Sequence, residues 1–166
     1  MHQPGEPGPP YFHLVETGAE LTNAAVQTAS RTGVFVAEVD GGRSRTTPDF
    51  FGQIGRAFQF PDYFGHNWNA VDECLADLNW AQADAYTLVV RDAWLLLSSE
   101  APDERRLLWR ILSRVAEEWK APATVGASWA HGRIAFHVFL LGPREELPTM
   151  ASEIEAVGCA AEIVYA

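Results

Sequence analysis

Apolar residues recur along this chain with the spacing of strands in some places and of helices in others. Short runs rich in β-branched and aromatic residues predict strands at residues 33–39, 86–91 and 134–141. The second run is continuously apolar, which is typical of a strand covered on both faces, as in a parallel sheet. The turn signal at residues 40–42 (Asp-Gly-Gly) ends the first run.

Between these runs, apolar residues recur at the spacing of helices. Phe50, Phe51, Ile54 and Phe58 predict a helix that Thr46 or Thr47 can cap, with Pro48 at its start. Residues 102–120 alternate apolar and charged positions in the pattern of a long amphipathic helix. Strands separated by helices predict an α/β fold, a small parallel sheet of about three strands flanked by helices, with N- and C-terminal extensions.

The two ends of the chain have weaker patterns. Residues 1–10 are Pro and Gly punctuation, so we expect a disordered leader there. The remaining expected divisions are an N-terminal extension at 11–32, one domain at 33–141, and a C-terminal part at 142–166 packed on the same domain. Within the extensions, the pattern allows a short strand at 11–15, a weak helix at 21–30, a helix at 143–157 and an extra strand at 160–165.

Composition narrows the class of protein. A chain of 166 residues with 48% hydrophobic residues suits one domain with a real core. It contains no long apolar run and no signal-peptide pattern, so we expect a soluble, cytoplasmic protein with no membrane partner. Cys74 and Cys159 lack metal-type spacing, so we expect buried free thiols and neither metal nor cofactor. The net charge of −10 disfavours direct binding of nucleic acid and suits a basic protein partner.

The stretch from Phe58 to Trp80 is the densest part of the sequence. Pro61 and Gly65 interrupt the helical pattern, and Asn67 is a suitable N-cap for a helix that begins at Trp68. That helix has two stripes at helical spacing, an apolar one and an opposite polar one: Val71, Cys74, Leu75 and Leu78 against Asn69, Asp72, Glu73 and Ala76. An ordinary surface helix would show the same division. The aromatic side chains of Tyr63, Phe64 and Trp68 beside the polar stripe favour an interaction surface instead.

Residues 63–70 (Tyr-Phe-Gly-His-Asn-Trp-Asn-Ala) and 72–75 (Asp-Glu-Cys-Leu) resemble the signature of the barstar family, intracellular inhibitors of barnase-type ribonucleases. The order of elements from residue 34 to residue 141 is also similar to that of the family. The resemblance implies a small α/β fold with a three-stranded parallel sheet. It further implies that the loop and helix block the active site of a basic extracellular-type ribonuclease.

Carried over onto this sequence, the resemblance implies that Glu73 is the principal acid and that Tyr63 and Trp68 are contact aromatics. Such a carboxylate would imitate phosphate against the cationic groups of a nuclease. Asn69 and Asp72 depart from the family pattern, at positions where an acid and an aromatic are typical. The expected partner-binding residues are Tyr63, Trp68, Asn69, Asp72, Glu73, Ala76, Trp80, Glu117 and Glu118.

Two other functions stay open. The departures at Asn69 and Asp72 are compatible with an interaction module of the same fold that binds a protein other than a nuclease. A small hydrolase could combine His66 and Glu73 with His131 or His137 as acid and base. No nucleophile elbow, phosphate loop or metal spacing accompanies these residues, so we expect no enzyme activity.

Overall fold

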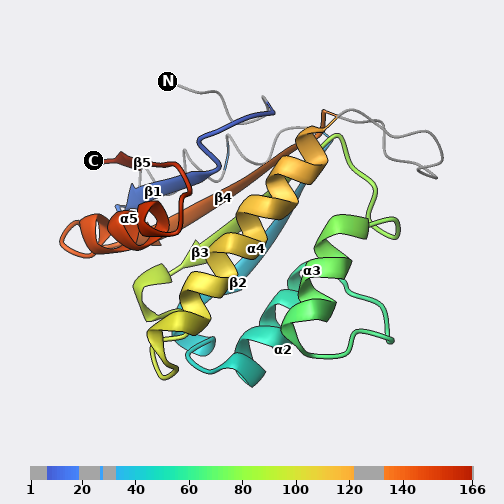
Figure 1. Ribbon diagram of the computed structural model, residues 1–166, viewed down its shortest axis with the longest axis horizontal. Helices are drawn as coiled ribbons and strands as arrows, with labels where there is room; N and C mark the ends of the chain where they lie inside the picture. The colour runs from blue at the N-terminus through green and yellow to red at the C-terminus, as the bar shows by residue number, and fades with distance from the viewer. Residues whose placement is uncertain (1–6, 19–26, 28–32, 122–132, 166) are drawn as a thin grey trace.

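The computed structural model describes residues 7–18, 27, 33–121 and 133–165 and shows one parallel sheet with helices packed on it (Figure 1). The sheet has five strands in the order β2-β3-β4-β1-β5. Their bounds are Phe12–Glu16 for β1, Val34–Asp40 for β2, Ala85–Arg91 for β3, Ala135–Gly142 for β4 and Ala161–Val164 for β5. Every pairing along this order is parallel.

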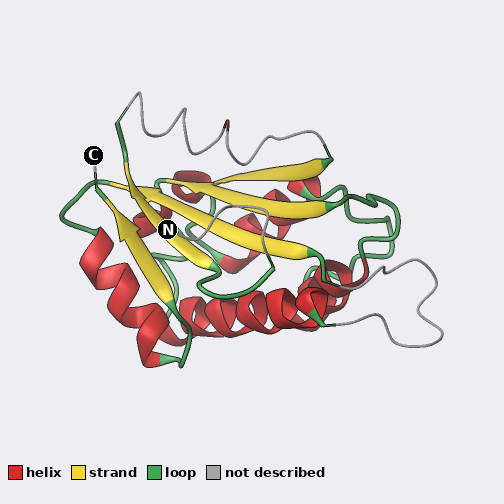
Figure 2. Ribbon diagram, turned by 90° about the horizontal axis from the view of Figure 1, so that it is seen from above, coloured by secondary structure: helices red, strands yellow, loops and turns green. Residues whose placement is uncertain are grey.

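Helices α2 to α5 lie along one face of the sheet (Figures 1 and 2). Their bounds are Thr47–Ala57 for α2, Trp68–Asp77 for α3, Pro102–Lys120 for α4 and Leu147–Ala156 for α5. Short 3-10 turns at Gly41–Arg43 and Ala93–Leu95 follow β2 and β3. Within the described residues, no helix is both long enough and apolar enough to cross a membrane.

The main core lies between the helices and the sheet. Alternate strand residues such as Leu14, Leu88 and Phe136 face the helices, whereas Val89 and Phe139 belong to a smaller cluster on the opposite face. Trp109 of α4 is fully buried and meets Phe12 of β1 edge to face, with ring centroids 5.9 Å apart. The long helix is therefore anchored on a strand that comes from the N-terminal part of the chain.

The α/β class and the parallel sheet predicted from the pattern are confirmed, but the sheet has five strands rather than about three. The two additional strands are β1, which pairs with both β4 and β5, and β5 at the edge. The short strand that the pattern allowed at 11–15 and the extra strand at 160–165 are both present, but runs of five and four residues carry too little periodicity to show that they pair with the main sheet. The domain boundaries stay predictions. Residues 1–6 of the expected leader and most of the weak helix at 21–30 lie outside the described residues.

Candidate functional site

The loop between α2 and α3 is held by its own backbone and by aromatic packing. The amide of Phe60 donates to the carbonyl of Gly55 at 2.8 Å, and the amide of Phe64 donates to that of Pro61 at 2.9 Å. The Phe64 ring is buried, 4.8 Å from the ring of Phe60. Tyr63, the neighbour of Phe64, is 72% exposed. The loop thus buries one aromatic ring and presents the next one to solvent.

Helix α3 begins as the sequence predicts. Asn67 caps it by accepting the amide of Ala70 at 2.9 Å. Trp68, the first helical residue, packs between Phe50 and Phe51 of α2, at 5.6 and 5.1 Å between ring centroids. Its indole N–H donates to Glu104 of α4 at 2.7 Å. The structure therefore gives Trp68 an internal role in joining three helices, and its contact with a partner stays a prediction.

One ion pair distinguishes one residue of the polar stripe of α3, Asp72, from the other members of that stripe. Asp72 pairs with Arg114 of α4, and Arg114 also bonds Glu118 at 2.7 Å. The hydrogen bond with Asp72 is the largest of the effects that raise the pKa of Arg114. Two of the acids expected to face a partner are thus neutralised within the chain. Asn69 and Glu73 are exposed, and Ala76 is half-buried.

The other two expected contacts, Glu117 in the last turn of α4 and Trp80 in the segment after α3, are also engaged internally. Glu117 accepts the hydroxyl of Tyr11 at 2.6 Å and pairs with Lys120 at 3.1 Å. These bonds lower the pKa of Glu117. The indole N–H of Trp80 donates to the carbonyl of Phe58 at 3.0 Å. The structure places Glu117 and Glu118 on α4 rather than beside Tyr63 and Glu73.

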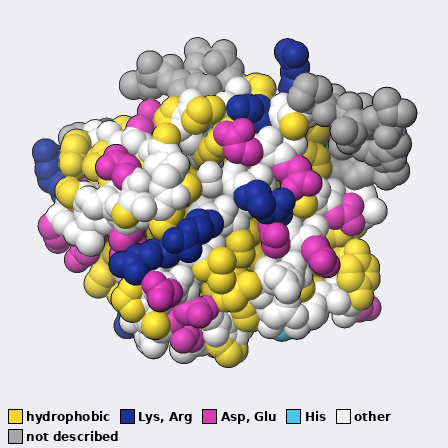
Figure 3. Space-filling view, viewed as in Figure 1, with side chains coloured by type: hydrophobic (Ala, Val, Ile, Leu, Met, Phe, Trp, Pro, Cys, Tyr) yellow, Lys and Arg dark blue, Asp and Glu magenta, His cyan; other side chains and the backbone are white. Residues whose placement is uncertain are grey.

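A groove of about 140 Å³ lies where the loop meets α3, and we call it the Tyr63 groove. It is lined by Tyr63, Phe64, Ala70, Glu73, Cys74 and Asp77. Burial, followed by the charges of Asp77 and Glu73, raises the pKa of the Cys74 thiol, so this thiol stays protonated. Figure 3 shows acidic side chains gathered over α3 and the neighbouring part of α4. The groove therefore combines an apolar floor with an aromatic wall and two carboxylates.

Asp77 is the member of the Tyr63 groove that sequence reasoning missed. It follows Glu73 by four residues, as Glu73 follows Asn69, so helical spacing alone could have found it. In the described part of the chain, neither Glu73 nor Asp77 makes an ion pair or a side-chain hydrogen bond. Both carboxylates are available to an external cation.

The histidines proposed for a hydrolase lie in unrelated places. His137 is buried in β4, 2.8 Å from a ring nitrogen of His13, whereas His66 is exposed on the loop. His131 lies outside the described residues. No group of three or more His, Cys, Asp or Glu side chains that could hold a metal ion occurs among the residues described. The expectation of no enzyme activity stays a prediction.

Solved structures share the fold. The ORC2 protein of Aeropyrum pernix in its ADP form aligns with 97% of this chain at a TM-score of 0.64 and 16% identity. CDC6P from Pyrobaculum aerophilum covers 92% (TM-score 0.54, 14% identity), and Drosophila ORC bound to GC-rich DNA and Cdc6 covers 93% (0.53, 13%). The chain spans 44%, 38% and 48% of these proteins, so less than half of each. No curated protein matches the chain.

These neighbours correct the functional prediction. They are ORC and Cdc6 proteins rather than ribonuclease inhibitors, and the Drosophila protein is bound to DNA and Cdc6. The prediction of an inhibitor of barnase-type ribonucleases is therefore wrong, as is the partner prediction that named a basic ribonuclease and excluded nucleic acid. The geometry supplies a physical reason: Asp72, Glu117 and Glu118 are bonded within the chain, and Asn69 carries no charge. Of the acids expected to contact a nuclease, Glu73 is the one that makes no ion pair with the residues that the structure describes.

A protein-family model matches the part of the sequence that contains the loop and α3. The model described as Barstar (barnase inhibitor) matches residues 34–140, which run from β2 into β4 and include the loop and α3. Strands β1 and β5 and helix α5 lie outside the match. Because the match covers more than half of the sequence, the chain belongs to the Barstar family.

Proposed function

We propose that this chain is a protein-binding module whose Tyr63 groove receives an arginine or lysine side chain of a partner protein. The observation that carries the proposal is the pair of unengaged carboxylates, Glu73 and Asp77, beside the exposed ring of Tyr63. A carboxylate forms short, charge-assisted hydrogen bonds with a guanidinium, and an aromatic face attracts a cation. The apolar floor formed by Phe64, Ala70 and Cys74 suits the aliphatic stem of the same side chain.

The charge of the whole chain supports the same proposal. A net charge of −10 creates a field that attracts cationic surfaces and accelerates encounter, and this attraction weakens as salt is added. The exposed ring of Tyr63 is a suitable anchor, since tyrosine is enriched among residues that dominate binding energy. The two cysteines are free and buried, which supports a cytoplasmic location as part of the proposal.

The ORC2 structure is an ADP form, but this chain has no phosphate-binding loop for a nucleotide. A phosphate-binding loop requires a lysine in the pattern G-x-x-x-x-G-K-[ST]. The single lysine of the whole sequence is Lys120, which ends α4 and pairs with Glu117. Nucleotide hydrolysis is therefore no part of the proposed function.

The test uses random-sequence peptides displayed on phage and selected on the full chain. We expect selected peptides to be enriched in Arg or Lys, and to bind a Glu73→Gln variant about tenfold more weakly, the equivalent of about 1.4 kcal/mol. Glu155→Gln is the matched control, because Glu155 is exposed on α5 and also loses one charge. Selected peptides without a cation, or equal weakening by both substitutions, would overturn the proposal.

A further inference from the structure

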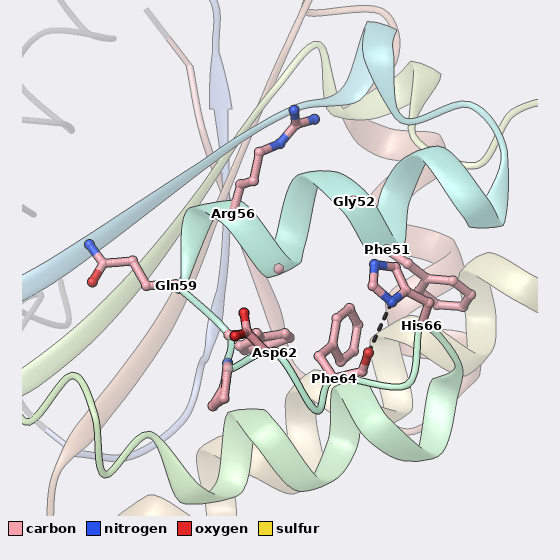
Figure 4. Close-up of a pocket in the computed structure, with 10 residues that line it drawn as sticks. Phe51, Gly52, Arg56, Gln59, Asp62, Phe64 and His66 are labelled. Atoms are coloured by element: carbon pink, nitrogen blue, oxygen red, sulfur yellow. Dashed lines mark hydrogen bonds between the residues drawn. The ribbon is translucent and has the colours of Figure 1, made fainter.

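A second and larger cavity, of about 500 Å³, lies on the other side of the loop, against α2 (Figure 4). We call it the α2 cavity. Its lining includes Gly52, Gly55, Arg56, Asp62, Phe64 and His66. Phe64 also lines the Tyr63 groove, so the two hollows share one wall and the loop forms a ridge between them. A partner protein that binds over this loop would contact both the Tyr63 groove and the α2 cavity.

Two glycines leave the α2 wall of this cavity bare. Gly52 and Gly55 lie three residues apart on one face of the helix, where glycine costs about 1 kcal/mol relative to alanine. Packing explains Gly55, because a Cβ there would lie 3.3 Å from the Phe64 ring. It does not explain Gly52, where an added Cβ would have no heavy atom within 4 Å. The helix thus keeps an open face that internal contacts do not require.

The floor of the α2 cavity is aromatic, and its rim carries two opposite charges, Arg56 on α2 and the exposed carboxylate of Asp62 on the loop. The rings of Phe60 and Phe64 meet edge to face, and His66 lies 4.6 Å from Phe64. Nδ1 of His66 donates to the carbonyl of Phe64 at 3.0 Å, which holds the imidazole beside the floor, as Figure 4 shows. Arg56 is exposed and points outward from α2 in the same view, and it makes no ion pair with any residue that the structure describes.

We infer that the α2 cavity receives a large apolar side chain of the same partner protein, followed by an acidic residue that pairs with Arg56. This inference rests on the proposed function and adds a second, independent contact to it. The aromatic floor and the bare face at Gly52 fit an apolar ring or branched chain. The charges on the two sides of the ridge suit an ordered partner segment. Glu73 and Asp77 attract a cation on one side, and on the other Arg56 points away from Asp62, with which it forms no ion pair, and can pair with a partner carboxylate.

The test compares phage selections on the wild-type chain and on Gly52→Leu, with Gln53→Leu as control. The Cβ of the added leucine meets no heavy atom within 4 Å, and leucine has a higher helix propensity than glycine, so the variant is expected to fold. Gln53 is the next residue of α2 and does not line the cavity. We expect wild-type peptides to carry an apolar residue beside an acid as well as the cation. Selection on Gly52→Leu should lose the apolar preference and keep the cation, with wild-type peptides binding at least tenfold more weakly.

Arg56→Gln provides a second measurement, since it leaves the cavity open and should remove only the acidic preference. Identical peptide preferences for wild type, Gly52→Leu and Arg56→Gln would overturn the inference. If selected peptides need the cation but ignore Gly52, the inference fails and the proposed function stands. If no cation is selected and Glu73→Gln has no effect, the proposed function fails as well. If Gln53→Leu and Gly52→Leu weaken peptide binding equally, this result would also count against the α2 cavity.

Discussion

The same substitution at two positions of α2 should stabilise the fold at Gly52 but not at Gly55. Gly52→Ala should raise the free energy of unfolding by about 1 kcal/mol, because a helix-interior glycine costs about that much and the new methyl group meets nothing within 4 Å. Gly55→Ala places its methyl 3.3 Å from two carbons of the Phe64 ring and 3.8 Å from Phe60. Because Phe64 is buried, moving its ring should cost about 1–3 kcal/mol, which offsets or exceeds the gain.

Urea unfolding followed by circular dichroism measures both effects. With a slope of about 2 kcal/mol per molar, the Gly52→Ala midpoint should rise by about 0.5 M, and the Gly55→Ala midpoint should stay or fall. In a Phe64→Leu background, Gly55→Ala should regain part of the stabilisation expected from helix propensity, because the smaller leucine side chain can move aside. Equal stabilisation by both alanines would refute the reasoning and show that the Phe64 ring does not rest against α2.

Three further predictions concern the core and its titrating groups. Trp109→Ala should lower the free energy of unfolding by about 3–5 kcal/mol in a chemical denaturation experiment, because the ring is fully buried against Phe12. Hydrogen bonds from Tyr11 and Lys120 lower the pKa of Glu117 in the folded chain, so stability should fall as pH drops through that value, and Tyr11→Phe should flatten this acid limb of the stability profile. Burial raises the pKa of Tyr86 to about 12, so stability should fall as pH rises from 10 towards 12, with a smaller fall in Tyr86→Phe.

Local signals in the sequence predict the elements around the site well. The helix from 102 to 120 has the predicted bounds, and Thr46 caps α2 by accepting the amide of Asp49 at 3.3 Å. Asn67 caps α3 for the same reason: a side-chain oxygen satisfies an amide that the first turn leaves free. These features depend on residues within one turn of each other, which a pattern can contain.

Long-range pairings could not be predicted in the same way. Asp72 meets Arg114 across 42 positions, and the hydroxyl of Tyr11 reaches Glu117 across 106. Periodicity shows which face of a helix is polar, but it does not show which of those polar groups will be neutralised by another element. The predicted stripe therefore contained Asp72, which is engaged, and omitted Asp77, which is available. The open face of α2 at Gly52 could not be predicted either, because the cavity there is formed together with the loop that faces the helix.

The two kinds of comparison cover different lengths of the chain. The Barstar match ends at residue 140 and contains α2, the loop and α3, which form both hollows. The likeness to ORC2 covers 97% of the chain, so it extends well beyond residues 34–140, whereas the Barstar match leaves out β1 and β5. A hydrogen-bonded chain joins these strands to β4, from His137 to His13 at 2.8 Å and from His13 to Glu162 at 2.5 Å. Because α2 packs on β2, at the opposite edge of the sheet from β5, changes in the added strands should alter stability before they alter the site.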